Sequence, residues 1–248
     1  MASDEAAHAQ ALARLRAAPA ARLFLDYDGT LVDIVAQPEL AVVDDDLRAL
    51  LLALCGRPRT EVAIVSGRPR PWLAAQLATL PLTLCAEHGL WLRRAGDDWR
   101  MLAEASFDRR AVVRAMEEAT QRHPGARFEE KDRAAAFHYR NAVIDDDTLA
   151  ALKAAFAAAA GPAALMLDGN CVIEIVPRGV SKALAVQALK QEGEDVVVFA
   201  AGDDTTDLAL LNAIPDDALA ATVGERLPPR ALHFDHPASL RTFLRGLL

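Results

Sequence analysis

Short apolar runs alternate with helix-like segments in the first part of the chain and again in its last third. Apolar runs of this length that end at polar turns are typical of strands buried on both faces. Their alternation with helical patterns favours a parallel sheet with crossover helices. The expected strands lie at residues 23–26, 61–66, 82–86, 196–201, 219–223 and 231–234, and the expected helices at 44–55, 71–80, 181–191 and 205–213. The pattern therefore predicts an α/β fold with a Rossmann-like parallel sheet.

The order of predicted elements differs between these two parts, where a helix, paired strands, a second helix and a hairpin follow one another. The helices are expected at 108–121 and 146–160, the strands near 127–130 and 134–139, and the hairpin from 165–167 through the turn Asp168-Gly169-Asn170 to 171–176. We therefore expect a small α/β domain at residues 106–176, inserted into a sheet domain made of residues 1–105 and 177–248.

Acidic residues follow two of the expected strands. Asp26 and Asp28 lie at and just after the end of the strand at 23–26, and Asp203 follows the strand at 196–201. Open α/β folds bind their ligands at the carboxyl ends of the strands. A carboxylate placed there can attack phosphorus, and a second acid two residues on can handle the proton of the leaving group. The first two acids therefore predict a phospho-aspartyl enzyme, whereas the alternative is that they only shape a turn.

Acids that meet at one edge of a sheet need a positive partner. Two unit charges about 4 Å apart repel by about 4 kcal/mol at an intermediate dielectric. A hard divalent cation that takes oxygen ligands and bridges to phosphate suits such a site best. The acids therefore predict bound Mg²⁺.

Four motifs, in order along the chain, resemble those of the haloacid-dehalogenase superfamily. They are Asp26-Tyr27-Asp28-Gly29-Thr30, Ser66 in Ile64-Val65-Ser66-Gly67-Arg68, Lys182 in Gly179-Val180-Ser181-Lys182, and Gly202 to Asp207. Five segments narrow the resemblance to the trehalose-phosphatase family: Ser-Gly-Arg at 66–68, Ala-Glu-His-Gly at 86–89, Glu-Glu-Lys at 129–131, Phe-His-Tyr-Arg at 137–140 and Val-Ile-Glu-Ile-Val-Pro at 172–177. Together the motifs span about residues 22–210.

The resemblance implies a haloacid-dehalogenase core with an inserted α/β cap, and Mg²⁺-dependent hydrolysis of trehalose 6-phosphate through a phospho-aspartyl intermediate. It implies the following roles: Asp26 as nucleophile, Asp28 as general acid and base, Ser66 and Lys182 as phosphate-binding groups, Asp26, the Asp28 backbone carbonyl and Asp203 as Mg²⁺ ligands, and Asp204 or Asp207 as residues that orient these ligands. The chain departs from the family pattern at Ala183 and Leu208, where glycine and glutamate are usual. Leu208 removes a charge near the metal loop, which bears on metal affinity and efficiency more than on the type of reaction.

Recognition of a sugar requires several hydrogen-bonding side chains, because a site that pairs each hydroxyl rejects analogues that lack one. The candidate substrate-binding residues are Arg68, Glu130, Lys131, His138, Arg140 and Glu174. Alternation along the expected strand places His138 and Arg140 on one face. The alternative for the inserted domain is an ordinary solvated sheet face.

Composition limits the partners. The 248 residues are 52% apolar and 25% charged, with a net charge of −8 and a pI near 5.3, which argues against nucleic-acid and anionic-membrane binding. The longest apolar stretch, 154–167, is interrupted by Gly161-Pro162 and is too short to span a bilayer. Three widely spaced cysteines are expected to be reduced core residues, and the N-terminus does not resemble a signal peptide. A cytoplasmic monomer is the expectation.

Two other functions remain open at this point. The same core and cap could serve another sugar phosphate, such as sucrose 6-phosphate or mannosyl-phosphoglycerate, or a phosphohexomutase reaction. Alternatively, the chain could be a catalytically silent regulatory domain that binds a sugar phosphate, as occurs when such a domain is fused to a glycosyltransferase. A trehalose-phosphate synthase of the same pathway is the expected partner activity.

Overall fold

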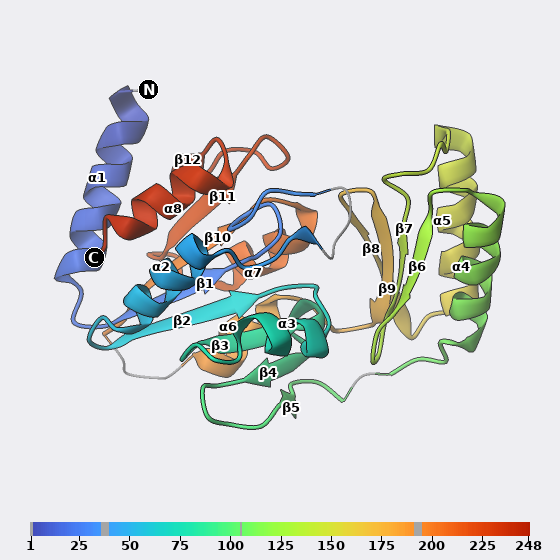
Figure 1. The fold of residues 1–248 in the computed structure, drawn as a ribbon, viewed down its shortest axis with the longest axis horizontal. Helices are drawn as coiled ribbons and strands as arrows, with labels where there is room; N and C mark the ends of the chain where they lie inside the picture. Colours follow the sequence, from blue (N-terminus) through green and yellow to red (C-terminus); the bar gives the residue numbers. More distant parts are fainter. Residues whose placement is uncertain (1, 36–39, 105, 191–194) are drawn as a thin grey trace. The chain divides into compact units, whose positions relative to one another are not determined.

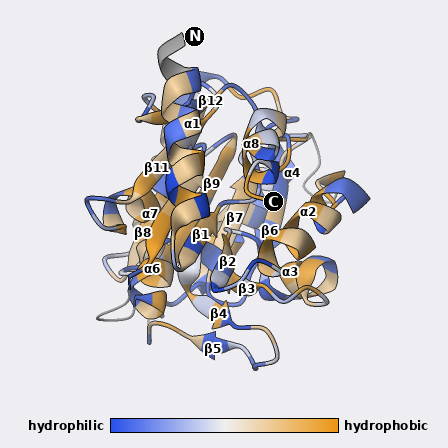
Figure 2. Cartoon of the chain, turned by 90° about the vertical axis from the view of Figure 1, so that its left-hand side faces the viewer, coloured by the Kyte–Doolittle hydropathy of each residue, from blue (hydrophilic) through white to orange (hydrophobic). Residues whose placement is uncertain are grey.

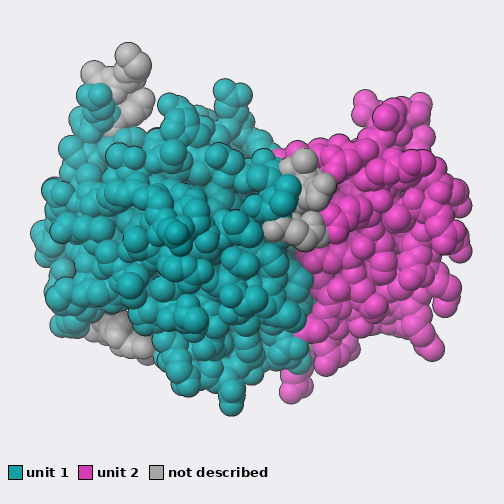
Figure 3. All heavy atoms as spheres, in the orientation of Figure 1, with its two compact units in different colours: residues 1–102, 181–248 teal, residues 103–180 magenta. Residues whose placement is uncertain are grey.

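The chain forms two compact units (Figure 3). A computed structural model describes residues 2–35, 40–104, 106–190 and 195–248. The larger unit comprises residues 1–102 and 181–248, and the smaller one comprises residues 103–180. The boundaries expected from the sequence were 105/106 and 176/177. The smaller unit thus begins and ends within a few residues of the expected insertion.

The larger unit is built on an eight-stranded sheet of order β12-β11-β10-β1-β2-β3-β4-β5 (Figure 1). Its strands are β1 (Ala21–Leu25), β2 (Thr60–Val65), β3 (Thr83–Ala86), β4 (Trp91–Arg93), β5 (Arg100–Met101), β10 (Val197–Gly202), β11 (Leu219–Val223) and β12 (Leu232–Phe234). The pairs from β12 to β3 are parallel, and β4 and β5 extend the sheet antiparallel. The predicted α/β class with a parallel sheet is confirmed.

Helices cover both faces of this sheet. They are α1 (Ala2–Ala17), α2 (Asp45–Cys55), α3 (Arg70–Leu77), α6 (Ala183–Leu189), α7 (Leu208–Ala213) and α8 (Pro237–Arg245), with short 3-10 turns η2 (Glu87–Gly89) and η3 (Thr205–Asp207). Along β1, Leu23 and Leu25 join the apolar core that includes residues of α1, α2, α3 and α8, whereas Phe24 joins the core under α6 and α7. Both faces of the central strands are therefore buried, which explains their continuous apolar runs.

The sequence pattern also missed or misplaced several elements. α1, α8, β4 and β5 were not anticipated, and the expected helix at 205–213 begins with the 3-10 turn η3. The C-terminal end expected for the helix at 181–191 lies outside the described residues. Among its described side chains α1 buries Ala11 and Leu15, and β4 is a strand of three residues. β4 and β5 are short strands that depend on pairing within the sheet, which local periodicity does not record, whereas α8 does carry a helical spacing of buried residues at Leu240, Phe243 and Leu244.

The smaller unit is a four-stranded antiparallel sheet of order β6-β7-β9-β8. Its strands are β6 (Arg127–Glu130), β7 (Ala135–His138), β8 (Ala164–Gly169) and β9 (Val172–Pro177), and its helices are α4 (Arg110–Arg122) and α5 (Asp146–Ala160). Phe137, Ile173 and Ile175 pack in one core with Met116 of α4 and Phe156 of α5. One sheet face therefore carries the helices, and the side chains that alternate with these residues form the other face.

The hairpin turn of the smaller unit differs from the expected Asp168-Gly169-Asn170. β8 continues through Gly169, and the loop consists of Asn170 and Cys171, with Cys171 at φ 57°. Because β8 pairs with β9 as far as Gly169 and Val172, the strand register sets the loop at two residues. The three cysteines are unpaired, as expected, but only Cys85 is fully buried.

None of the helices in the described part of the chain is both long enough and apolar enough to cross a membrane. Figure 2 shows hydrophilic positions interspersed along α1, which is a 16-residue helix. Its composition is that of a helix lying partly in solvent.

Neighbouring leucines of α2 offer a direct test of the core. Leu51 is fully buried and Leu52 is 53% exposed. We expect Leu51→Ala to lower the free energy of unfolding by about 2–5 kcal/mol, since it removes buried methyl groups and leaves a cavity. Leu52→Ala should change it by less than about 0.5 kcal/mol. Urea unfolding followed by circular dichroism measures both, and similar losses would contradict the packing of α2.

Candidate active site

The carboxyl ends of two neighbouring parallel strands bring the principal acids together. Asp26 follows β1, and Asp203 follows the buried residues of β10, with Leu25 paired to Ala201 between the strands. The backbone N–H of Asp26 donates to the Ala201 carbonyl at 3.1 Å. Asp26 and Asp203 are only 4% and 3% exposed. The parallel register therefore holds two carboxylates at one sheet edge, shielded from water.

A buried lysine lies between two of the acids. Lys182 Nζ donates to Asp26 Oδ1 at 2.6 Å and to Asp207 Oδ1 at 2.6 Å. The other oxygen of Asp207 accepts the backbone N–H groups of Asp203, at 3.1 Å, and Asp204, at 3.2 Å. Asp207 thus ties the loop after β10 to Lys182, and Lys182 ties that loop to the end of β1.

The pKa values of Asp26, Asp203 and Lys182 are all shifted, because several carboxylates lie close together in a buried site. Burial raises the pKa of Asp26 well above its usual value, Asp207 adds to the rise, and Lys182 offsets it only in part. Burial and Asp207 also raise the pKa of Asp203, to about 6. Burial alone would lower the pKa of Lys182, but Asp207 and Asp26 raise it well above the usual value. Lys182 therefore stays protonated, and its single positive charge does not fully compensate the negative charges of the neighbouring carboxylates.

The donor set suits a hard metal ion. One carboxylate oxygen from each of Asp26, Asp203 and Asp207 lies within 4.8 Å of the others, and all three residues are buried. Oxygen ligands of this kind favour Mg²⁺ over softer transition metals. Because both oxygens of Asp207 already accept hydrogen bonds, Asp207 is better placed to orient the site than to give up an oxygen to a metal.

Asp204 lies at the start of η3, where its carboxylate is engaged locally. Asp204 Oδ1 accepts the Thr206 backbone N–H at 2.8 Å and its hydroxyl at 2.6 Å. Despite burial, which opposes ionisation, Lys182 and these hydrogen bonds lower the pKa of Asp204. Its carboxylate therefore shapes the loop around Asp203.

Asp28 is held by an arginine from the second motif. Arg68 Nε and Nη2 donate to the two oxygens of Asp28 at 2.8 and 2.5 Å, and the guanidinium stacks over the Trp72 ring at 4.5 Å. The Arg68 backbone N–H also donates to Ser66 Oγ at 3.1 Å. The structure thus joins Arg68, proposed above as a substrate-binding residue, to the predicted general acid. A bidentate pair of this kind fixes the position of the Asp28 carboxyl group.

Gly29 allows Asp203 to approach the first motif. Its φ is +86°, and a Cβ at this position would lie 2.2 Å from Asp203 Oδ2. The Thr30 hydroxyl donates to the other oxygen of Asp203 at 3.3 Å. Only a residue without a side chain fits here, because the Asp203 carboxylate fills the space.

A strained turn supports Ser66. Glu87 and His88, both buried, have φ values of 48° and 56°, which L-residues seldom adopt. Their backbone N–H groups donate to the carbonyls of Arg68, at 3.1 Å, and Ser66, at 3.0 Å. The turn therefore fixes the backbone on which Ser66 lies, and its sequence signal was the Ala-Glu-His-Gly segment.

Sequence reasoning did not anticipate Arg226. This residue lies between β11 and β12, and its Nη1 donates to Asp203 Oδ2 at 2.8 Å and lies 3.9 Å from Asp204 Oδ2. No local motif marked it, because its partners lie more than twenty positions away in the sequence. Its contact with Asp203 exists only through the fold.

In the smaller unit, the sheet face opposite the helices carries an ion pair and a hydrogen-bonded pair. Lys131 Nζ donates to Glu174 Oε1 at 2.7 Å, and both side chains are buried. His138 Nε2 lies 2.8 Å from Glu129 Oε2. The register pairs Glu129 with Ala136 and Ala136 with Glu174, so these residues share a row across the sheet.

Two predicted substrate-binding residues lie elsewhere in the smaller unit. Glu130 is adjacent to Glu129 on β6 and so points to the opposite face, where it lies 3.5 Å from Arg109 Nη1. Arg140 lies beyond the end of β7 and donates to the Asn170 carbonyl at 2.8 Å. The structure thus brings together Lys131, His138 and Glu174, together with Glu129, which the sequence analysis did not include.

The trehalose-phosphatase family profile matches residues 24–216. The chain belongs to the trehalose-phosphatase family. This confirms the resemblance to this family drawn from the five segments at 66–68, 86–89, 129–131, 137–140 and 172–177. The match contains the acids, Lys182 and the whole of the smaller unit, but it ends before Arg226.

Individual trehalose-phosphatase relatives agree with this assignment. The chain is 39% identical over 209 residues to a bifunctional trehalose-6-phosphate synthase/phosphatase of Thermoproteus tenax, covering 82% of this chain and 28% of that protein. It is 33% identical over 187 residues to the trehalose-6-phosphate phosphatase of Escherichia coli, covering 74% and 70%. The solved C-terminal domain of the C. albicans trehalose-6-phosphate phosphatase superposes with a TM-score of 0.86 at 26% identity, covering 97% and 96%.

The chain aligns with only part of several of these relatives. It spans between 25% and 29% of the length of the curated relatives from T. tenax, Dictyostelium discoideum and Arabidopsis thaliana. Its family membership therefore describes one segment of such larger proteins.

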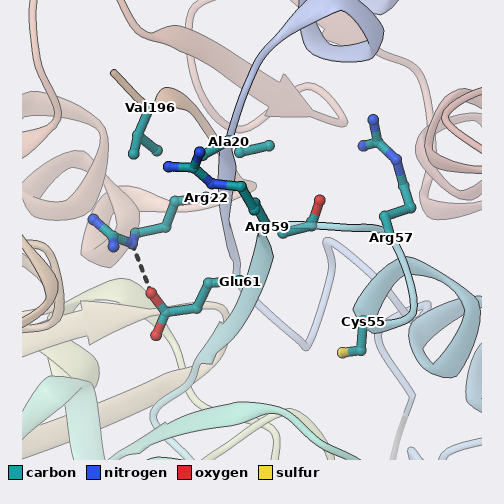
Figure 4. A pocket seen from close by; sticks show the side chains of 9 residues that line it. Ala20, Arg22, Cys55, Arg57, Arg59, Glu61 and Val196 are labelled. Atoms are coloured by element: carbon teal, nitrogen blue, oxygen red, sulfur yellow. Dashed lines mark hydrogen bonds and ion pairs between the residues drawn. The ribbon is translucent and has the colours of Figure 1, made fainter. Parts of the chain in front are cut away.

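A cavity of about 420 Å³ lies elsewhere on the larger unit, at the amino ends of β1 and β2. Arg22, Arg57 and Glu61 are among the residues that line it. Arg22 Nε donates to Glu61 Oε2 at 2.8 Å, and Figure 4 shows Arg57 pointing away from this pair. The cavity lies at the end of the strands opposite to Asp26 and contains none of the predicted catalytic residues.

Substitution of two glycines separates collision from backbone strain. Gly29 and Gly96 have nearly the same φ, +86° and +85°, but a Cβ at Gly96 would meet nothing within 4 Å. With chelator present, we expect Gly96→Ala to lower the free energy of unfolding by about 1–2 kcal/mol through strain alone. Gly29→Ala should lower the free energy of unfolding by about 1–3 kcal/mol more than Gly96→Ala does, because the new Cβ would collide with Asp203. Urea unfolding measures both, and equal losses would show that Asp203 moves aside freely.

Proposed function

We propose that this chain hydrolyses trehalose 6-phosphate to trehalose and phosphate, and that the reaction depends on Mg²⁺. The observation that carries the proposal is the buried network in which Lys182 joins Asp26 to Asp207 beside Asp203. Membership of the trehalose-phosphatase family supports the substrate. The E. coli relative, of which the chain covers 70%, is named a trehalose-6-phosphate phosphatase.

Asp26 is the proposed nucleophile. One oxygen of Asp26 attacks phosphorus in line, the bond between phosphorus and the sugar oxygen breaks, and a phospho-aspartate forms. Asp28 donates a proton to the departing sugar oxygen. A water molecule then attacks the phospho-aspartate while Asp28 accepts its proton, and the bond from Asp26 to phosphorus breaks. Free phosphate and the original Asp26 carboxylate result.

The hydrogen-bond partner of Asp28 has to change during the reaction cycle. In the structure, both its oxygens accept hydrogen bonds from Arg68. To act as an acid, Asp28 exchanges an Arg68 contact for the sugar oxygen. Because the Asp28 side chain is 35% exposed, water can deliver the proton that it donates.

The proposed Mg²⁺ ligands are the Asp26 carboxylate, the backbone carbonyl of Asp28 and the Asp203 carboxylate. When bound there, the ion would neutralise charge on the phosphoryl oxygens and lower the cost of bringing an anionic substrate to these acids. Lys182 fixes one oxygen of Asp26 and stays positive throughout, which leaves the other oxygen for chemistry. Asp204 and Asp207 shape the loop that presents Asp203.

Sugar recognition is assigned to the polar sheet face of the smaller unit. Glu129, Lys131, His138 and Glu174 offer both donors and acceptors, and trehalose carries hydroxyls on two rings. Both pairs, Lys131 with Glu174 and His138 with Glu129, are already formed in the structure, so little side-chain entropy remains to be lost on binding. A ligand that lacks one hydroxyl leaves a polar group of this set unpaired.

The synthase that makes trehalose 6-phosphate is the proposed partner activity, because the T. tenax relative is named a synthase/phosphatase. The monomeric state and the cytoplasmic location stay predictions from the sequence. Retention of Asp26 and Asp28 argues against a silent regulatory domain, since binding alone requires neither a nucleophile nor a proton donor.

The nucleophile is tested by Asp26→Asn. We expect phosphate release from trehalose 6-phosphate to fall by at least about a thousandfold, since an amide cannot form the phospho-aspartate. Asp33→Asn, which alters an exposed acid seven positions away, should keep full activity. The assay uses trehalose, sucrose and glucose 6-phosphates, with Mg²⁺ and with chelator.

The outcomes of that assay distinguish the proposed function from its alternatives. Substantial residual activity of Asp26→Asn would exclude Asp26 as nucleophile. Mg²⁺-dependent release from a different sugar phosphate would keep the core chemistry and replace the substrate. No release from any of the three would favour the regulatory domain.

The adjacent acids of β6 test the sugar-binding face. Glu129→Gln should raise KM for trehalose 6-phosphate by about tenfold, with a smaller effect on kcat, because it removes a charged partner of the proposed sugar site. Glu130→Gln, on the other face of the same strand, should leave both constants within about twofold. Steady-state kinetics of the two variants decide the matter, and the reverse ranking would place the sugar on the helical side of the sheet.

A further inference from the structure

Asp26, Asp203, Asp204 and Asp207 form an acidic cluster at the carboxyl ends of β1 and β10. Arg226 contacts this cluster from a segment outside the four motifs. Its Nη1 lies 2.8 Å from Asp203 Oδ2 and 3.9 Å from Asp204 Oδ2. The Arg226 side chain is 33% exposed, whereas that of Asp203 is 5% exposed. A partly solvated guanidinium therefore reaches into the cluster and pairs with Asp203, one of the carboxylates proposed to bind the metal.

Among the described residues, Lys182 and Arg226 supply positive charge to different carboxylates of the cluster. Lys182 pairs with Asp26 and Asp207, and Arg226 pairs with Asp203 and lies near Asp204. Lys182 is buried between its partners, so it cannot leave without exposing them to each other. Arg226, by contrast, can move its charged group into water at little cost.

We infer that Arg226 competes with the divalent cation for Asp203, pairing with this carboxylate in the metal-free protein and yielding it when metal binds. This inference rests on the proposed function, which places the cation at the same carboxylate. A cation and a guanidinium that share a carboxylate repel each other, so Arg226 lowers the affinity for metal. The competition also gives the metal-free protein a counter-charge that keeps its acids together.

The opposite role, in which Arg226 orients Asp203 for the metal, is disfavoured by the other contacts of Asp203. Its Oδ1 accepts a hydrogen bond from the Thr30 hydroxyl, and its carboxylate fills the space left by the missing side chain of Gly29. Its backbone N–H donates to Asp207. These contacts hold Asp203 in place without Arg226. The two roles predict changes of opposite sign in metal affinity.

The test measures Mg²⁺ binding directly, by isothermal titration calorimetry on the full chain. We expect Arg226→Gln to bind Mg²⁺ at least about tenfold more tightly than the unmodified protein, because a repelling charge is lost. Its melting temperature in chelator should fall, because the acids lose a counter-charge. Arg226→Lys, which keeps the charge, should stay closer to the unmodified protein.

Arg230→Gln is the matched control. Arg230 belongs to the same loop and donates to Asn212 Oδ1 at 2.6 Å. Its loss removes an equal charge from the loop without removing a partner of Asp203, so Mg²⁺ affinity should stay within about twofold. An equal gain in Arg230→Gln would assign the effect to general charge and overturn the inference.

A second measurement in the unmodified protein covers the case in which Arg226→Gln does not fold. The side-chain N–H signal of Arg226, identified in NMR spectra by its absence from Arg226→Lys, should shift as Mg²⁺ is added, while that of Arg230 stays in place. An unchanged Arg226 signal at saturating Mg²⁺ would overturn the inference.

The outcomes separate this inference from the proposed function. Equal or weaker Mg²⁺ binding by Arg226→Gln, with Mg²⁺-dependent hydrolysis by the unmodified protein, overturns the role of Arg226 alone. Tighter binding without hydrolysis of any sugar phosphate supports the role of Arg226 and overturns the function. Absence of Mg²⁺ binding by the unmodified protein overturns both the inference and the assigned cofactor.

Discussion

The buried ammonium of Lys182 is the interaction on which the rest of the active site depends. It joins Asp26 at the end of β1 to Asp207 in the turn after β10. Removing one partner of such a buried group typically costs about 3–5 kcal/mol, because the remaining charge is left uncompensated. The same ammonium makes it feasible to bury the proposed nucleophile Asp26 within reach of two other carboxylates. Stability and chemistry therefore rely on one charge balance.

The sheet supplies the geometry that this balance requires. β1 lies between β10 and β2, so the loops that carry Asp26, Asp203 and Ser66 leave neighbouring strands at the same edge. Apolar side chains bury both faces of these strands, which leaves their carboxyl ends as the place for polar groups. The strained turn at Glu87 and His88 adds a backbone support for Ser66 from β3. Rigid strands thus position residues that repel one another.

The sequence was sufficient where a signal was local. Continuous apolar runs marked β1, β2 and β10, and the acids after β1 and β10 marked the sheet edge of the candidate site, because strand and acid are adjacent in the chain. It was insufficient where a contact depends on tertiary structure. Arg226 meets Asp203 through a loop, so their contact leaves no periodic pattern in the sequence.

The smaller unit shows a finer limit of the same kind. The pair Glu129 and Glu130 is evident in the sequence, but its members point to opposite faces, and only the pairing with Ala136 and Glu174 decides which one joins the polar face. A shift of one residue in β6 would exchange the two acids and break the contact of His138 with Glu129. The ion pair between Lys131 and Glu174 opposes such a shift, since it ties the residue after β6 to β9. The proposed sugar specificity therefore rests on strand register, which the side chains of the polar face themselves help to fix.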